Sequence, residues 1–143
     1  MTTAAVAGLF LRDRIETFHL PTILFIFFLG GFFGWWAVEL VSHVLKQYVR
    51  VRWLFLAIAI TALAAGTVFV TAGLFALEYR SFYAQWHAEP PSHIWLLQFL
   101  FTSASAYYQF AVMALRLYLP LGPVFLAAAA WLFRYRWNPL RAL

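Results

Sequence analysis

The fold is decided by residues 21–40, which read PTILFIFFLGGFFGWWAVEL and contain a single ionisable side chain, that of Glu39. A transmembrane helix needs about 20 predominantly apolar residues, and this run supplies them. Pro21 suits the first turn of a helix, where its missing N–H costs no hydrogen bond. Because apolar residues continue toward Val49, we predict a membrane-spanning helix over residues 21–49.

The composition of the whole chain extends this conclusion. Of its 143 residues, 65% are hydrophobic and 10% are charged, whereas soluble domains carry about 25% charged residues. A soluble domain of this length buries roughly 70% of the surface of its unfolded chain, which would leave too much apolar surface in water. We therefore predict a single domain that is integral to a membrane and all-α.

Three further apolar runs follow the first, and a polar stretch that contains Pro90 and Pro91 interrupts them. The helices predicted from these runs cover residues 53–77, 94–118 and 121–135, and residues 78–93 form one short extramembrane loop. Residues 1–19 are predicted to be an interfacial lead-in, because a short apolar patch there is followed by charged side chains. The predicted fold is an integral membrane bundle of about four transmembrane helices.

The basic residues allow two topologies. With four spans, both termini and the 78–93 loop share one side, which the positive-inside rule places in the cytoplasm. With three spans, residues 94–133 cross once, and the basic residues between the first two helices join the C-terminal arginines on one side. The three-span alternative has the cleaner charge bias. We favour four spans because residues 94–133 are about twice as long as one crossing requires.

Charge and cysteine content exclude several classes of function. The formal net charge is +5, but the ten lysine and arginine residues flank apolar runs, which is typical of residues that set topology and contact anionic lipid. We expect the bilayer as a partner and no nucleic acid. The chain has no cysteine, which excludes disulfide bonds, thiolate metal sites and cysteine nucleophiles.

A polar stripe follows one face of the third predicted helix. Its members are Gln98, Thr102, Ser105, Gln109 and Arg116, which lie within about 60° of one another at ~100° per residue. Lipid cannot satisfy these groups, so the stripe should face other helices or a hydrated cavity. It has two interpretations: interhelical hydrogen bonds, which contribute only about 0.6 kcal/mol each, or the lining of a ligand, quinone or ion path.

The first predicted helix carries a second polar face. Glu39 and His43 are four residues apart and can hydrogen-bond to each other. Ionisable residues inside a membrane are costly and tend to be functional, although a neutral pair or a helix end in water would also explain them. We predict that Glu39 lies close to Arg116, with His43 and Gln109 beside them, as a binding cluster.

Small residues predict close packing of the first two helices. Gly30 and Gly34 form a GxxxG motif, and the second helix has a face that contains Ala59, Ala62, Gly66 and Gly73. Missing side chains let two helix backbones approach closely. The partner of Gly30 and Gly34 is either in this chain or in another, so the motif also predicts self-association or contact with other membrane subunits.

No motif selects a cofactor. Haem b held by two histidines needs imidazoles at similar depth on different helices, and only His43 among the four histidines is predicted to be embedded. Haem or quinone remains possible without a specific motif, and we expect no metal site. The predicted function is a small membrane subunit or accessory protein, not catalytic on its own. The alternatives are a redox anchor that helps bind quinone or haem, and a small transporter, channel or intramembrane lipid-modifying enzyme.

Overall fold

The computed structural model describes residues 1–16, 19–45, 48–49 and 51–136, and every regular element in them is helical, which confirms the predicted all-α class for these residues. The α-helices are α1 (Thr2–Phe10), α2 (Leu20–Leu45), α3 (Arg52–Tyr83), α4 (His93–Gln109) and α5 (Leu121–Arg136). The shorter segments are the 3₁₀ helix η1 (Ala84–Trp86), the π-helix η2 (Phe110–Ala114) and the 3₁₀ helix η3 (Leu115–Tyr118).

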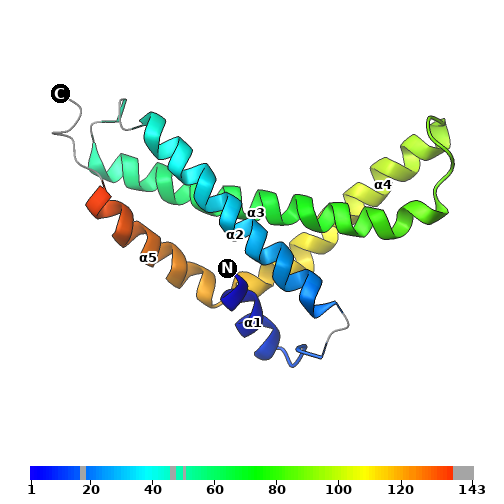
Figure 1. The fold of residues 1–143 in the computed structure, drawn as a ribbon, viewed down its shortest axis with the longest axis horizontal. Coiled ribbons are helices and arrows are strands. Elements are labelled where there is room, and N and C mark those ends of the chain that lie inside the picture. Colours follow the sequence, from blue (N-terminus) through cyan, green and yellow to red (C-terminus); the bar gives the residue numbers. More distant parts are fainter. Residues whose placement is uncertain (17–18, 46–47, 50, 137–143) are drawn as a thin grey trace.

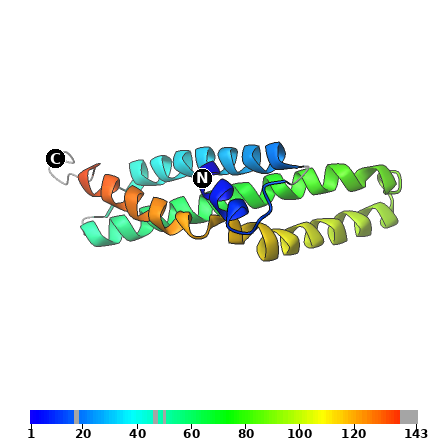
Figure 2. The same cartoon turned by 90° about the horizontal axis from the view of Figure 1, so that it is seen from below.

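Helix α3 runs along the length of the molecule and contacts each of the other long helices (Figures 1 and 2). Helix α2 packs against it as its antiparallel neighbour. Helix α4 lies along the C-terminal part of α3, where Gln109 donates a hydrogen bond to Tyr79. Helix α5 lies along the N-terminal part of α3, where Phe133 packs with Phe55. Together, α4 and α5 therefore run antiparallel to the whole of α3.

Two helices of the described chain, α2 and α3, are each long and apolar enough to cross a membrane. Residues 93–118 and α5 add a third candidate if they cross as one unit, bent by 67° at a short break. Helix α5 alone has 16 residues, fewer than the roughly 20 that a crossing needs. The structure thus contains two or three candidate spans, and the predicted count of four is not confirmed.

The break between α4 and α5 follows from Pro120. A proline pushes the residue before it out of the helical region, and Leu119 is extended, with φ −91° and ψ 139°. The preceding helix is already irregular, because it changes from α to π at Phe110–Ala114 and then to 3₁₀ at Leu115–Tyr118. The uninterrupted helix predicted over residues 94–118 is therefore three consecutive segments with different hydrogen-bond patterns.

Helix α3 continues six residues beyond its predicted end, so the 78–93 loop shrinks to residues 84–92. Contacts with α4 and within α3 itself explain the extension. The guanidinium group of Arg80 lies 3.8 Å from the centre of the Phe99 ring, and the rings of Tyr79 and Tyr83 are 4.6 Å apart. These aromatic contacts hold the polar last turns of α3 in a helix that composition alone assigned to a loop.

Gly30 and Gly34 bring α2 into close contact with α3. A Cβ atom added at Gly34 would lie 2.9 Å from the Cα atom of Thr67, and one added at Gly30 would overlap the hydroxyl oxygen of Thr71. At this separation of the helices, only glycine fits at either position. The motif therefore packs within the chain, against Thr67 and Thr71 of α3.

The small-residue face predicted on α3 is used only in part. Ala59 is buried with Val38 of α2, and a Cβ atom added at Gly66 would lie 3.3 Å from the Cβ atom of Ala37. In contrast, a Cβ atom at Gly73 would meet nothing within 4 Å. The close contact with α2 is therefore made by alanines and threonines together with Gly66.

The lead-in predicted over residues 1–19 contains a helix that packs into the bundle. Helix α1 contacts α2, α5 and η3, and Ala4 and Ala5 are fully buried. A Cβ atom added at Gly8 would lie 2.9 Å from both the Cα atom and the carbonyl oxygen of Leu117. The start of α1 lies beside the middle of α2 (Figure 1).

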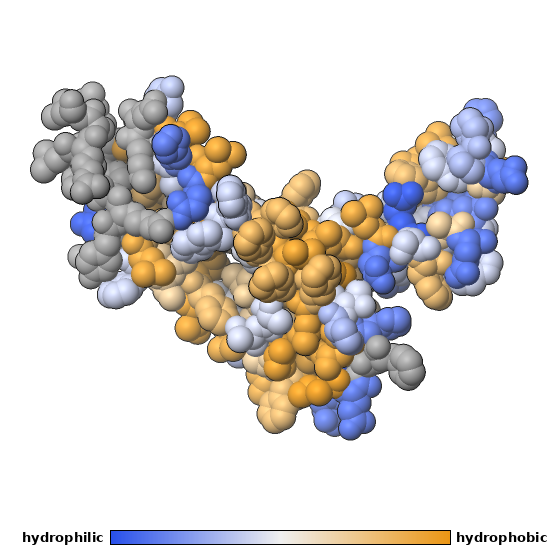
Figure 3. Space-filling view, viewed as in Figure 1, coloured by the Kyte–Doolittle hydropathy of each residue, from blue (hydrophilic) through white to orange (hydrophobic). Residues whose placement is uncertain are grey.

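Much of the apolar surface of the long helices is not covered by the chain itself. Within the most apolar 18-residue windows, 28% of the residues of α2 and 33% of those of α3 are buried. The rings of Phe28, Phe32 and Trp36 form an exposed ridge along α2. Figure 3 shows hydrophobic side chains over the centre of the molecule and hydrophilic ones gathered toward the α3–α4 end. This distribution is compatible with a membrane protein.

Candidate functional site

A cavity of about 590 Å³ lies where α1, α2 and the η2–η3 segment meet. Its volume falls in the range of roughly 300–1,000 Å³ that is usual for small-molecule sites. Most of its lining is apolar. The polar residues in the lining are Arg12, Arg14, Thr71, Gln109 and Arg116.

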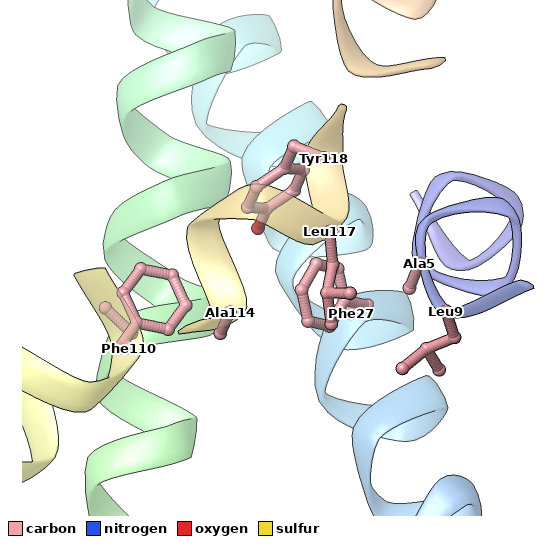
Figure 4. Packing of buried hydrophobic residues seen from close by; sticks show 8 residues of the cluster. Ala5, Leu9, Phe27, Phe110, Ala114, Leu117 and Tyr118 are labelled. Carbon is pink, nitrogen blue, oxygen red and sulfur yellow. The ribbon is translucent and has the colours of Figure 1, made fainter. Parts of the chain in front are cut away.

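Buried side chains from three elements form the apolar wall. Leu9 of α1, Phe27 of α2 and Leu117 of η3 belong to one buried cluster and all line the cavity. The rings of Phe27 and Tyr118 have their centres 4.9 Å apart. Figure 4 shows Leu9 and Ala5 of α1 facing Phe27 and Leu117 across this junction. The wall therefore exists only when α1 is docked.

A buried chain of hydrogen bonds ties η3 to α3 beside the cavity. The Tyr118 hydroxyl donates to the hydroxyl oxygen of Thr71 over 2.7 Å. The Thr71 hydroxyl in turn donates to the carbonyl oxygen of Thr67 over 2.7 Å. Since buried polar groups are costly unless they are hydrogen-bonded, these bonds fix the position of the η3 segment that carries Arg116 and Leu117.

The C-terminal end of α1 places two arginines at the cavity. The Arg14 N–H donates to the carbonyl of Leu9, and the Asp13 N–H donates to the carbonyl of Phe10. This pair of bonds is a Schellman motif, which requires a left-handed residue after the helix, and Asp13 has φ 53°. Arg12 donates from Nη1 to the carbonyl of Gly8 over 2.9 Å. The reversal of the chain at Asp13 therefore leaves Arg12 and Arg14 in the cavity lining.

The π-helix η2 interrupts the α-helical periodicity of the third predicted helix after Gln109. A π-turn contains one more residue than an α-turn, and such segments are frequent at functional sites. Before this turn, Gln109 donates from Nε2 to the Tyr79 hydroxyl over 3.1 Å. After it, Arg116 lines the cavity together with Arg12 of the α1 end. The α-helical periodicity used to predict the stripe therefore ends at residue 109, although Gln109 and Arg116 both line the cavity.

The charge of the cavity is not balanced by its own lining. Three arginines line it and no carboxylate does. Within the described residues, no carboxylate forms an ion pair with Arg12, Arg14 or Arg116; Asp13 lies between the first two in sequence but outside the lining. All three side chains are exposed at the mouth, where each can donate several hydrogen bonds. The site can therefore accept an anion next to an apolar wall.

The structure brings together two of the four residues of the predicted binding cluster. Gln109 and Arg116 line the cavity, whereas Glu39 and His43 do not. Glu39 is half-buried and lies twelve residues beyond Phe27 on α2, which is roughly 18 Å along the helix axis. Glu39, the one acid of α2, therefore does not balance the charge of the cavity.

Sequence reasoning missed Arg12 and Arg14 as site residues. It assigned them to the interfacial lead-in, because they follow an apolar patch too short to span a membrane. The relevant local signal is the alternation of Arg12, Asp13 and Arg14 directly after a short apolar helix, which is typical of a helix end. That signal does not predict that α1 packs against Leu117, because Leu117 lies far from α1 in the sequence.

The remaining stripe residues mainly hold the loop before α4. Gln98 accepts a hydrogen bond from the Ala88 N–H over 2.8 Å, and Thr102 Oγ1 lies 3.3 Å from Nε2 of His87. Thr102 also donates to the carbonyl of Gln98, and Ser105 is exposed. Gln98 and Thr102 therefore contact the residues just before α4 and do not line the cavity.

The histidines and acids show no metal-binding arrangement in the described part of the chain, where no group of three or more His, Cys, Asp or Glu residues is placed to hold a metal ion. His43 lies near the C-terminal end of α2, and His87 and His93 lie on either side of the Pro90–Pro91 turn. The cavity lining contains no histidine, so its chemistry is that of arginine, amide and hydroxyl groups.

No protein-family model, curated protein or solved structure matches this chain. A function therefore has to be argued from the cavity and from the exposed faces of the helices.

Proposed function

We propose that this chain is a multi-pass integral membrane subunit that binds an amphiphilic membrane molecule in the cavity between α1, α2 and η2–η3. The observation that carries the proposal is the combination of an apolar wall with three exposed arginines in the lining of one cavity. Val112 and Met113 line the same cavity and are 37% and 56% exposed. An apolar tail can therefore leave the cavity beside these two residues and continue into lipid.

For the topology, we propose that α2 and α3 each cross the membrane and that α4 and α5 cross it once together as a broken span. The packing of Phe133 against Phe55 supports this arrangement. The C-terminal arginines then share a side with Arg52 and with the basic residues just before it in sequence. The positive-inside rule places this side in the cytoplasm, as expected for the C-terminus, and moves the loop over residues 84–92 to the opposite side.

Site-specific photocrosslinking in native membranes tests the binding function. A benzophenone amino acid replaces either Val112, inside the cavity, or Val124, which is 59% exposed on α5 and lies outside it. Both are exposed valines on the same broken span, so they are matched controls for each other. We expect one dominant adduct at position 112 and a mixture of bulk lipids at position 124. The same mixture at both positions would contradict a specific binding site.

The subunit part of the proposal is supported by the uncovered helix faces, including the aromatic ridge on α2. Purification in a mild detergent should co-isolate other membrane proteins. A monodisperse chain that is isolated alone and still holds its ligand would argue that it works independently.

A redox anchor is the second candidate, because Gln109 and Arg116 both line the cavity and can donate hydrogen bonds to quinone carbonyls. A quinone as the dominant adduct at position 112 would favour this candidate.

A further inference from the structure

We propose that the occupant of the cavity is an anionic phospholipid, whose phosphate lies among Arg12, Arg14 and Arg116 and whose acyl chain lies on the apolar wall. The inference rests on the proposed binding function and adds the chemical class of the ligand. Three properties of the cavity support it: the sign of its charge, its depth, and the shape of its lining.

The charge at the mouth selects an anion. Three arginines line the cavity, and no carboxylate of the described residues does; like charges in one site repel unless a counter-charge is present. Arginine presents its donors in a planar fork that matches phosphate oxygens and binds them in pairs. A neutral quinone would leave this charge unbalanced. A zwitterionic phospholipid would bring its own cation close to the arginines.

The depth of the cavity matches the headgroup level of a membrane. Ile23 and Ile26 of the lining belong to the first two turns of α2, and each residue adds ~1.5 Å along a helix. Arg12 and Arg14 follow α1 and so lie on the side where α2 begins, and Arg116 lines the same cavity. In the proposed arrangement this is a membrane surface, where the phosphate groups of the surrounding bilayer are found.

The lining separates a polar end from an apolar one. Phe27, Phe75 and Phe110 supply large apolar faces away from the arginines, and Met113 leads to the exposed surface. Methionine side chains adapt to irregular partners, as an acyl chain would be. A free inorganic anion would use the arginines and leave this apolar part of the cavity unused, so the lipid of the bilayer is the occupant that fits both ends.

Lipid titration of the purified, delipidated full-length chain in neutral detergent tests the inference. Native mass spectrometry would follow phosphatidylglycerol and phosphatidylcholine, added in equal amounts. The wild type should retain phosphatidylglycerol preferentially. A basic residue near a membrane surface contributes about 1 kcal/mol, or roughly fivefold in affinity. The double variant Arg12→Gln/Arg14→Gln should therefore bind phosphatidylglycerol about 25-fold more weakly.

Two control variants separate the site from net charge. Arg134→Gln/Arg136→Gln removes the same charge from the C-terminal end of α5 and should leave the preference unchanged. Asp13→Gly removes the acid between the two arginines and suits the left-handed backbone at φ 53°, so it should strengthen phosphatidylglycerol binding. Equal losses in the two double variants would overturn the inference, because net charge alone would then explain the preference.

Further outcomes separate the inference from the proposed function. Inorganic phosphate at the same concentration should not displace the lipid, since it lacks an apolar chain; displacement would show that the site binds an anion only and would overturn the lipid assignment. One dominant uncharged adduct at position 112, with no preference for phosphatidylglycerol, would leave the binding function standing and refute the anionic lipid. Bulk lipid at position 112 would refute the binding function itself.

Discussion

The close contact between α2 and α3 depends on which residues lack a side chain and which have a short one. Gly30 and Gly34 of α2 face Thr71 and Thr67 of α3. The sequence predicted a close approach at the two glycines correctly, because the GxxxG spacing puts them on one face. It did not predict the threonines as their partners. The small residues of α3 are spread around the helix, and only packing decides which of them face α2.

This contact predicts opposite results for two substitutions of the same kind. Gly34→Ala forces a Cβ atom to within 2.9 Å of the backbone of Thr67, and such overpacking costs about 1–3 kcal/mol. Gly73→Ala meets nothing within 4 Å and should be neutral or slightly stabilising, because alanine favours a helix over glycine. Tryptophan fluorescence during thermal unfolding in detergent measures both. Equal unfolding temperatures for the two variants would contradict the close contact.

At the scale of elements, the helices with regular apolar periodicity could be predicted from the sequence, whereas the irregular segment between α4 and α5 could not. The long apolar runs gave helices close to α2, α3 and α5, because burial in lipid imposes the same requirement on every turn. The segment from Phe110 to Tyr118 departs from α-helical geometry. Its shape depends on Pro120 and on the bond from Tyr118 to Thr71. A straight helix would have suggested that Arg116 faces Glu39. In the structure, Arg116 instead lines the cavity together with Leu9 of α1.

The docking of α1 on η3 predicts the effect of enlarging Gly8. In Gly8→Ala the new Cβ atom would lie 2.9 Å from the backbone of Leu117, so α1 has to shift. Hydrogen exchange of residues 1–16 should accelerate by roughly tenfold for a loss of about 1.4 kcal/mol, and the adduct at position 112 should decrease. Val6→Ala, on the exposed side of α1, is the control. Unchanged exchange in Gly8→Ala would show that α1 is not seated on η3.

At the scale of the whole molecule, the two topologies differ in the side on which α5 ends. The sequence could not decide between them, because the apolar length of residues 94–133 favours two crossings and the basic residues favour one. The structure adds the contact of Phe133 with Phe55, which returns the end of α5 to the beginning of α3. With a bend of 67° between them, residues 93–118 and α5 together form one candidate span.

Cysteine labelling can decide the topology, because the native chain has no cysteine to give a background signal. An impermeant maleimide is applied to sealed vesicles that carry Tyr48→Cys, Ala84→Cys or Ala142→Cys. We expect positions 48 and 142 to react from the same side and position 84 from the opposite side. If positions 84 and 142 react from one side and position 48 from the other, α4 and α5 are two separate crossings.

The packing of α1 against Leu117 also determines when α1 can dock during synthesis of the chain. Helix α1 leaves the ribosome before any other element, since chains are made from the N-terminus. Yet part of its docking surface, around Leu117, is synthesised only after α2, α3 and α4. The arginines at its end therefore reach their final place only after α2, α3 and α4 have been synthesised. Any nascent chain that stops before η3 carries Arg12 and Arg14 without a cavity to line.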